Sequence, residues 1–173
     1  MMRIAIDGYN FIKQIEEFRK LEQIELQKAR EGLIDRLVQY KRMKGYPITV
    51  VFDGAQEGRL AGHREHSKGI QVVFSRPGQK ADDVLKGMAS EARGGILIVT
   101  GDREVASFAE KKGAVVVSVA DFGMKLEMAR FYSTKGGEEE DSYGRSAIAP
   151  TKKGPSRRLP KTRRKALAAA KKL

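Results

Sequence analysis

The chain has 173 residues, of which 34 are lysine or arginine, 22 are aspartate or glutamate and none is cysteine. This length suits one domain with an appendage better than two domains. The lack of cysteine excludes disulfides and thiolate metal sites, and it fits a reducing cytoplasm. Asp7 comes too early for the apolar core of a signal peptide, and no apolar run is long enough for a membrane span.

The net charge of +12 is concentrated near the C-terminal end. Residues 145–173 hold eleven basic residues and no acidic one, whereas the remainder holds 23 basic and 22 acidic residues. Such a block indicates a polyanionic partner such as RNA, and a solubilising end is the alternative. Glycine, acidic and proline residues precede the block. We therefore expect a folded domain over 1–133, and a linker with a disordered basic tail over 134–173.

Short β-branched runs alternate along the chain with stretches of helical periodicity. In chain order, this pattern predicts a strand over 3–6, a helix over 21–44, a strand over 48–52, a loop over 55–69, a strand over 70–74, a helix over 81–92, a strand over 96–100, a helix over 103–112, a strand over 114–119 and a helix over 120–132. Continuous apolar strands that alternate with helices predict an α/β fold, with a parallel sheet covered on both faces.

Aspartates occur where predicted strands end. Asp7 and Asp53 directly follow the first two strands, and Asp102 lies just beyond the fourth. Asp82 and Asp83 open the helix that leads into that fourth strand. Because ligands of open parallel sheets bind beyond the carboxyl ends of the strands, these acids should share one edge of the sheet. Neighbouring strands lie ~4.8 Å apart, so the carboxylates should be close.

Clustered carboxylates repel one another, so either their pKa values rise or a cation binds between them. Oxygen ligands alone favour Mg²⁺ or Mn²⁺ over Zn²⁺. Such ions activate water and stabilise an in-line displacement at phosphorus, which indicates phosphoryl chemistry. Each acid also has an ordinary explanation, as an N-cap for Asp102 or as helix N-terminal charge for Asp82 and Asp83. Since Asp82 and Asp83 lie about 100° apart on a helix, we expect only one to face the site.

Four segments resemble the YacP-like NYN family of PIN-like nucleases: Ile6–Asn10, Val51–Gly54, Lys80–Asp83 and Val99–Asp102. The similarity covers roughly residues 2–132, and the ordered set is more specific than any one segment. The resemblance implies a PIN-like three-layer α/β/α fold with strand order 3-2-1-4-5. It also implies metal-dependent RNA endonuclease activity. The basic tail is then an addition to the family's minimal domain.

The resemblance also implies roles for particular residues. By position, the metal-binding acids are Asp7, Asp53, Asp82 and Asp102. Asn10 completes the catalytic set with Asp7, Asp82 and Asp102, because it closes the first loop and would orient Asp7 or a water at the metal. Thr100, the small hydroxyl residue before the last acid, and Asp83, ranked below Asp82, are supporting residues.

Basic residues close to the acids in sequence are candidates for contacts with the RNA backbone. They are Arg59, Arg64, Lys68, Arg76, Lys80 and Arg103, and the tail adds Arg157, Arg158, Arg163, Arg164 and Lys165. Ordinary solvated loops or ion pairs are the alternative for the first group. His63 and His66 are interpreted as ordinary loop residues. Tyr9 either stacks on a base or fills the core.

The leading interpretation is a metal-dependent endoribonuclease that acts on single-stranded or loop RNA. The second is a non-catalytic RNA- or ribosome-binding module on a nuclease scaffold. A phosphatase of the haloacid-dehalogenase type is disfavoured, because Tyr9 stands where its second aspartate is needed. No glycine-rich phosphate loop is present, so we expect no nucleotide cofactor. The sequence does not predict the oligomeric state.

Overall fold

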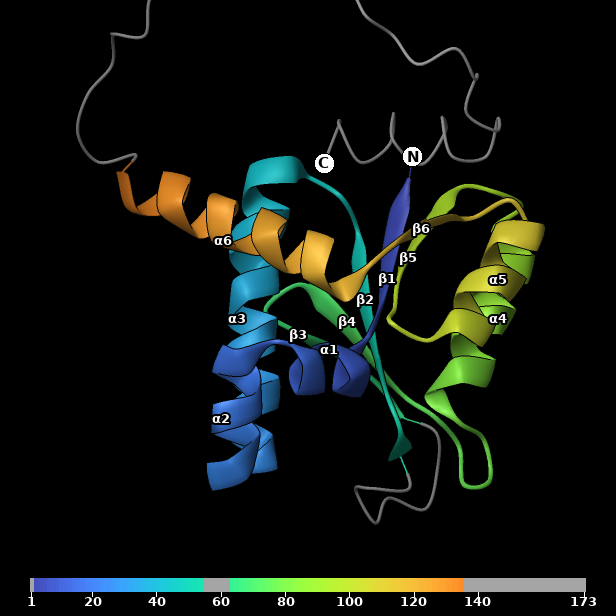
Figure 1. The fold of residues 1–173 in the computed structure, drawn as a ribbon, viewed down its shortest axis with the longest axis horizontal. Helices are drawn as coiled ribbons and strands as arrows, with labels where there is room; N and C mark the ends of the chain where they lie inside the picture. Colours follow the sequence, from blue (N-terminus) through green and yellow to red (C-terminus); the bar gives the residue numbers. More distant parts are fainter. Residues whose placement is uncertain (1, 55–62, 136–173) are drawn as a thin grey trace, which may run out of the picture.

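The computed structural model describes residues 2–54 and 63–135, drawn in colour in Figure 1. In chain order the elements are β1 (Arg3–Asp7), α1 (Gly8–Gln14), α2 (Glu16–Ile24), α3 (Leu26–Lys44), β2 (Ile48–Phe52), β3 (Arg64–Ser67), β4 (Ile70–Phe74), α4 (Ala81–Glu91), β5 (Ile96–Val99), α5 (Arg103–Lys111), β6 (Val115–Val117) and α6 (Val119–Lys135). Arg59 and the basic tail lie outside the described residues. No helix in the described ranges is both long enough and apolar enough to span a membrane.

The sheet has the strand order β3-β4-β2-β1-β5-β6. The pairings of β1 with β2 and β5, of β2 with β4 and of β5 with β6 are parallel. Without β3, this is the expected order 3-2-1-4-5, so the predicted fold class is confirmed. The order places β1 in the interior of the sheet, with β2 on one side and β5 on the other. The carboxyl ends of these strands therefore meet at one edge.

Helices cover both faces of the sheet, as the continuous apolar strands predict. In Figure 1, α1, α2, α3 and α6 lie on one side, and α4 and α5 lie on the other. The first layer packs a large core that includes Phe11, Tyr40 and Phe122 against the sheet. The second layer packs a smaller core around Leu85 and Val105. Alternation along each strand supplies both cores, because successive side chains point to opposite faces.

Two sequence expectations are wrong in detail. The predicted loop over 55–69 contains β3, which pairs antiparallel with β4 at the edge of the sheet. Its sequence is polar, because an edge strand is held by backbone pairing and needs no apolar face. The predicted helix over 21–44 is divided at Glu25, whose φ of −162° is extended. Helix α1 and residues 16–20 of α2 lie before the predicted start at residue 21 and were not predicted.

Candidate active site

Three of the predicted acids meet around the C-terminal end of β1. Asp7 is the last residue of β1, and Asp102 follows the neighbouring strand β5 as the N-cap of α5. Asp82 is in the first turn of α4, a helix that packs across β1 and β5. Asp7 is only 6% exposed, whereas Asp82 and Asp102 are partly exposed. The three carboxylates thus come from three separate parts of the chain.

The pKa values show that these acids share one electrostatic environment. Burial above all, together with the charges of Asp82 and Asp102, raises the pKa of Asp7 from 3.8 to about 6, against the lowering effect of the backbone hydrogen bond from Asn10. Burial and the charge of Asp102 also raise the pKa of Asp82. In the absence of a cation, the repulsion expected of clustered carboxylates is therefore present.

Asp7 and Asp102 are also helix caps. The Asp7 Oδ1 accepts a hydrogen bond from the Asn10 backbone N at 3.1 Å. The Asp102 Oδ1 accepts hydrogen bonds from the backbone N atoms of Glu104 at 2.7 Å and Val105 at 3.0 Å. The capping role and the site role are compatible, because each cap uses Oδ1. Within the described residues, the Oδ2 atoms of Asp7 and Asp102 make no hydrogen bond.

Asn10 and Thr100 hold the two acid-bearing loops in place. The Asn10 Oδ1 accepts hydrogen bonds from the Gly101 N at 2.8 Å and from the Gln14 Nε2 at 2.6 Å. The buried Thr100 Oγ1 accepts a hydrogen bond from the Asp102 N at 3.1 Å. A Cβ at position 101 would lie 2.0 Å from the Gln14 Nε2, so the Gln14 side chain would have to shift to admit it. The Asn10 side chain therefore bonds to the loop that carries Asp102, and the Asn10 backbone bonds to Asp7.

The other two predicted acids have different surroundings. Asp53 is near Tyr9, whose pKa it raises, and it is not among the main charges that act on Asp7. The placement of Asp53 in the metal-binding set therefore stays a prediction. The Asp83 Oδ2 accepts a hydrogen bond from the Lys80 backbone N at 3.1 Å, which makes Asp83 a helix-capping residue. Because one Asp83 carboxylate oxygen is used in this cap, Asp83 is a weaker candidate for the site than Asp82.

Two lysines at the site were missed from the sequence. The charge of Lys86 lowers the pKa of Asp82, and Lys86 forms an ion pair with Glu104 that joins α4 to α5. Lys13 on α1 lowers the pKa of Asp7. Lys86 lies one helical turn after Asp82, and this spacing would have identified it, because residues four apart share a helix face.

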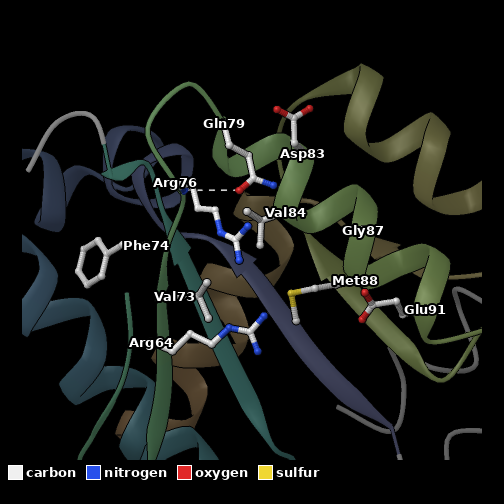
Figure 2. Close-up of a pocket in the computed structure, with 10 residues that line it drawn as sticks. All are labelled: Arg64, Val73, Phe74, Arg76, Gln79, Asp83, Val84, Gly87, Met88 and Glu91. Carbon is white, nitrogen blue, oxygen red and sulfur yellow. Dashed lines mark hydrogen bonds between the residues drawn. The ribbon is translucent and has the colours of Figure 1, made fainter. Parts of the chain in front are cut away.

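The predicted basic residues fall into separate groups. Arg64 and Arg76 line a groove beside α4, together with Gln79 (Figure 2). Lys80 and Arg103 are exposed at the N-terminal ends of α4 and α5, close to the acids in sequence. Lys68 lies in the turn between β3 and β4, at the opposite edge of the sheet, and forms an ion pair with Asp35. Its position does not support contact with a substrate at the carboxylates.

The contacts of Tyr9 decide between its two interpretations, and the structure also places the two histidines. Tyr9 is 5% exposed and packs on Phe52 with ring centroids 4.9 Å apart, so it fills the core rather than presenting a face to a base. Its hydroxyl accepts a hydrogen bond from Arg30 at 3.4 Å. The His63 Nε2 lies 3.3 Å from a Glu65 carboxylate oxygen. His66 lies in the edge strand β3, so its interpretation as a loop residue is wrong.

The oxygen ligands that Asp7, Asp82 and Asp102 offer suit a hard divalent cation, but the three side chains are not already arranged around one point. Within residues 2–54 and 63–135, no three histidine, cysteine, aspartate or glutamate side chains are close enough together to hold a metal ion. Asp7 nevertheless carries a raised pKa because it is buried beside two further carboxylates. Oxygen-only donors of this kind suit Mg²⁺ or Mn²⁺, and a cation would relieve their mutual repulsion.

Comparisons with known proteins agree with the fold. The model of the YacP-like NYN domain family matches residues 4–171. A protein named uncharacterized protein YacP, from Bacillus subtilis (strain 168), is 27% identical over 90 residues, so the match spans about half of each chain. The crystal structure of a mutant of Rae1 (YacP) from Bacillus subtilis has a TM-score of 0.68 at 21% identity, and covers 78% of this chain and 80% of that chain. A second Rae1 (YacP) structure has a TM-score of 0.66 at 22% identity, and it covers 79% of this chain and 80% of that chain.

The family match extends into the basic tail, so the expectation that similarity ends near residue 132 is wrong.

Proposed function

Because the chain belongs to the YacP-like NYN domain family, whose PIN-like fold indicates an RNA-related nuclease, we propose that it is a metal-dependent endoribonuclease. It would cleave phosphodiester bonds in single-stranded or loop RNA. The observation that carries the proposal is the buried Asp7, whose pKa is raised by its burial and by the charges of Asp82 and Asp102. A buried carboxylate with two acidic neighbours is costly for stability unless a cation balances it.

In this proposal, Asp7, Asp82 and Asp102 hold Mg²⁺ or Mn²⁺. Such a cation, when bound, lowers the pKa of water and neutralises charge on the phosphate. Asn10 and Thr100 are positioning residues, because they hold the loops that carry Asp7 and Asp102. Asp53 is left outside the set, since its charge is not among those that act on the pKa of Asp7.

RNA is the proposed partner, and the cytoplasm is the proposed location. Lys80 and Arg103 are exposed at the helix ends beside the acids, where they would contact backbone phosphates. The basic residues of the tail would add affinity that depends on salt. The tail residues are Arg157, Arg158, Arg163, Arg164 and Lys165. Tethering to the ribosome is a further proposed use of this tail.

The test is cleavage of a structured RNA by the purified full chain with Mn²⁺, with Mg²⁺ and with EDTA. The wild type is compared with Asp7→Asn and with Asp35→Asn, a matched change on the far helical layer. We expect metal-dependent cuts from the wild type and from Asp35→Asn, and none from Asp7→Asn. Equal cleavage by Asp7→Asn would overturn the site assignment.

A second candidate is a non-catalytic RNA- or ribosome-binding module. It is favoured by one observation, that most of the net charge of +12 lies in residues 145–173, outside the domain that carries the acids, where it suits RNA binding without cleavage. This candidate predicts salt-sensitive RNA binding by the wild type and by Asp7→Asn alike, with no cuts in any metal. Cleavage that requires Asp7 would exclude it.

A further inference from the structure

The outer strands of the sheet leave a groove beside α4. This helix packs mainly against β1, β2 and β5, so β4 and β3 extend past its edge. The groove between them has a volume of about 540 Å³, which is in the range of substrate-binding pockets. We call it the arginine groove, and we define it by Arg64, Val73, Arg76, Gln79, Val84 and Met88 (Figure 2).

The strand side of the arginine groove carries two cations. Arg64 is paired with Val73 across the antiparallel strands, and directly opposite residues point to the same face of a sheet. Arg64 therefore lies on the face that α4 covers, and Arg76 follows β4 on the same side. Figure 2 shows both guanidinium groups extending into the groove. Among the described residues, neither guanidinium group makes an ion pair or a hydrogen bond.

The helix side of the arginine groove is apolar at its centre. Val84 and Met88 lie one turn apart on α4 and face the strands (Figure 2). The Gln79 side chain lies at the upper end, where its Oε1 is 3.4 Å from the Arg76 backbone N. An apolar wall opposite two arginines suits a nucleotide, whose base is apolar on its faces and whose phosphate is anionic.

Two acids limit where an anion can bind in this groove. Asp83 lies at the start of α4, and its Oδ2 is occupied by the Lys80 backbone N. Glu91 is the last residue of α4. Its side chain is exposed and forms no ion pair with any of the described residues. Glu91 should therefore repel phosphates from the C-terminal end of α4 and favour their binding beside Arg64 and Arg76.

The arginine groove adjoins the candidate active site through the first turn of α4. Asp82 and Asp83 are successive residues, so their directions differ by about 100° around the helix axis. Asp82 faces Asp102, whereas Asp83 lines the groove. A strand that crosses the N-terminal end of α4 therefore passes from the carboxylates into the groove.

We propose that the arginine groove binds the single-stranded RNA segment that adjoins the scissile phosphate. Arg64 and Arg76 contact neighbouring phosphates, and a base lies against Val84 and Met88. This inference rests on the proposed function, because it names a substrate-binding part of the same site. The groove itself carries out no chemical step.

The first test measures RNA binding in EDTA, so that cleavage cannot occur. The full chain is titrated against a fluorescent, unstructured 12-nucleotide RNA, and anisotropy is recorded at several salt concentrations. We expect the double variant Arg64→Gln/Arg76→Gln to raise Kd about tenfold or more. Loss of two phosphate contacts should also reduce the slope of log K against log salt by about 1.4.

The matched control is Arg19→Gln/Arg42→Gln, which removes the same charge from exposed positions on the opposite helical layer. We expect this control to change Kd less than about threefold, since it alters only the general field. Equal losses of affinity in the two double variants would overturn the inference. Thermal unfolding of both variants confirms that each is folded.

A third variant should change the affinity for RNA in the opposite direction, toward tighter binding. Glu91→Gln removes the anion from the groove and should lower Kd for the same RNA by about two- to threefold. An unchanged or raised Kd would contradict the proposed path of the strand. Glu110→Gln, an exposed acid on α5, is its control.

Cleavage kinetics separate this inference from the proposed function. With Mn²⁺, the arginine-groove variant should raise KM for the 12-nucleotide RNA while kcat stays within about twofold of the wild type. If no RNA is cut by the wild type but the groove variant loses binding, the inference stands and the proposed function fails. If the cuts require Asp7 but the groove variant binds and cuts like the control, the inference fails and the function stands.

Discussion

The Asn10 side chain accepts a hydrogen bond from the Gly101 backbone N at 2.8 Å, which ties the loop after β1 to the loop after β5. The same residue donates its backbone N to the Asp7 Oδ1 at 3.1 Å. Asn10 therefore acts on both acid-bearing loops at once. Through these two bonds, one amide residue sets the relative position of Asp7 and Asp102.

Replacing Asn10 by alanine should lower kcat about tenfold with little change in KM, because the loops lose their link while RNA contacts remain. Asn10→Ala should also lower the free energy of unfolding by about 1 kcal/mol. Urea unfolding and steady-state cleavage measure the two effects. Gln14→Ala removes the other donor to the Asn10 Oδ1 and keeps the bond from Gly101, so it should lose less stability than Asn10→Ala. An equal loss of stability in both would show that the hydrogen bond to Gly101 is not what matters.

Because its pKa is raised, the ionised Asp7 lowers the free energy of unfolding at neutral pH. Its pKa in the folded state is about 6, against an ordinary value of 3.8. Between these values the folded state holds a proton that the unfolded state releases, so stability falls as pH rises through this window. Above pH 6 the full penalty is present. Asp7→Asn removes it, and should stabilise the apo protein by about 1–3 kcal/mol at pH 7.5.

The measurement is urea unfolding of both proteins in EDTA at pH 4 and at pH 7.5. The advantage of Asp7→Asn should be small at pH 4 and should reach its full size above pH 6. Adding Mn²⁺ should raise the stability of the wild type and leave Asp7→Asn unchanged, because a cation needs the carboxylate. A variant that is less stable than the wild type at pH 7.5 in EDTA would contradict the burial of an unbalanced charge.

The proximity of Asp7 and Asp102 was predictable from sequence, because each lies at the carboxyl end of an apolar strand and these ends share one edge of a parallel sheet. The interaction of Asp53 with Tyr9 was not predictable from sequence. Asp53 follows β2 in the same way, but its effect on Tyr9 depends on the packing of Tyr9 on Phe52, and these two residues are far apart in the sequence. The strand β3 was missed because Arg64 to Ser67 carry no apolar pattern, and only backbone pairing with β4 defines it.

Gly8 fixes how α1 starts against the sheet. A Cβ at this position would lie 2.3 Å from a ring carbon of Phe52, which is fully buried and cannot move aside. Gly8→Ala should therefore lower the free energy of unfolding by about 1–3 kcal/mol. Gly87→Ala is the control, since a Cβ there meets nothing within 4 Å and alanine favours the helix. Thermal unfolding should show Gly8→Ala melting lower and Gly87→Ala unchanged or higher.

The basic tail should contribute to affinity and not to chemistry. Removing residues 145–173 deletes eleven basic residues. Because each phosphate contact releases counterions, the truncated chain should bind RNA more weakly and with a shallower salt dependence. Cleavage of a short RNA at saturating concentration should stay within about twofold of the full chain. An unchanged salt slope would leave the tail without a role in RNA binding.

Lys86 should tune the acids that it accompanies. Its charge lowers the pKa of Asp82, while Asp102 and Asp83 raise it and Lys80 lowers it. Removing the charge with Lys86→Met should therefore raise the pKa of Asp82, so that more of the carboxylate is protonated at mildly acidic pH. The acidic limb of the pH–rate profile, measured at fixed Mn²⁺, should shift to higher pH.

Glu104→Gln separates this charge effect from the ion pair itself. The variant weakens the contact between α4 and α5 that Lys86 makes with Glu104, yet it keeps the lysine charge next to Asp82. Its acidic limb should therefore stay within about 0.3 pH units of the wild type. If Glu104→Gln shifts the limb as far as Lys86→Met does, then Lys86 acts by joining the helices, and its charge does not set the ionisation of Asp82.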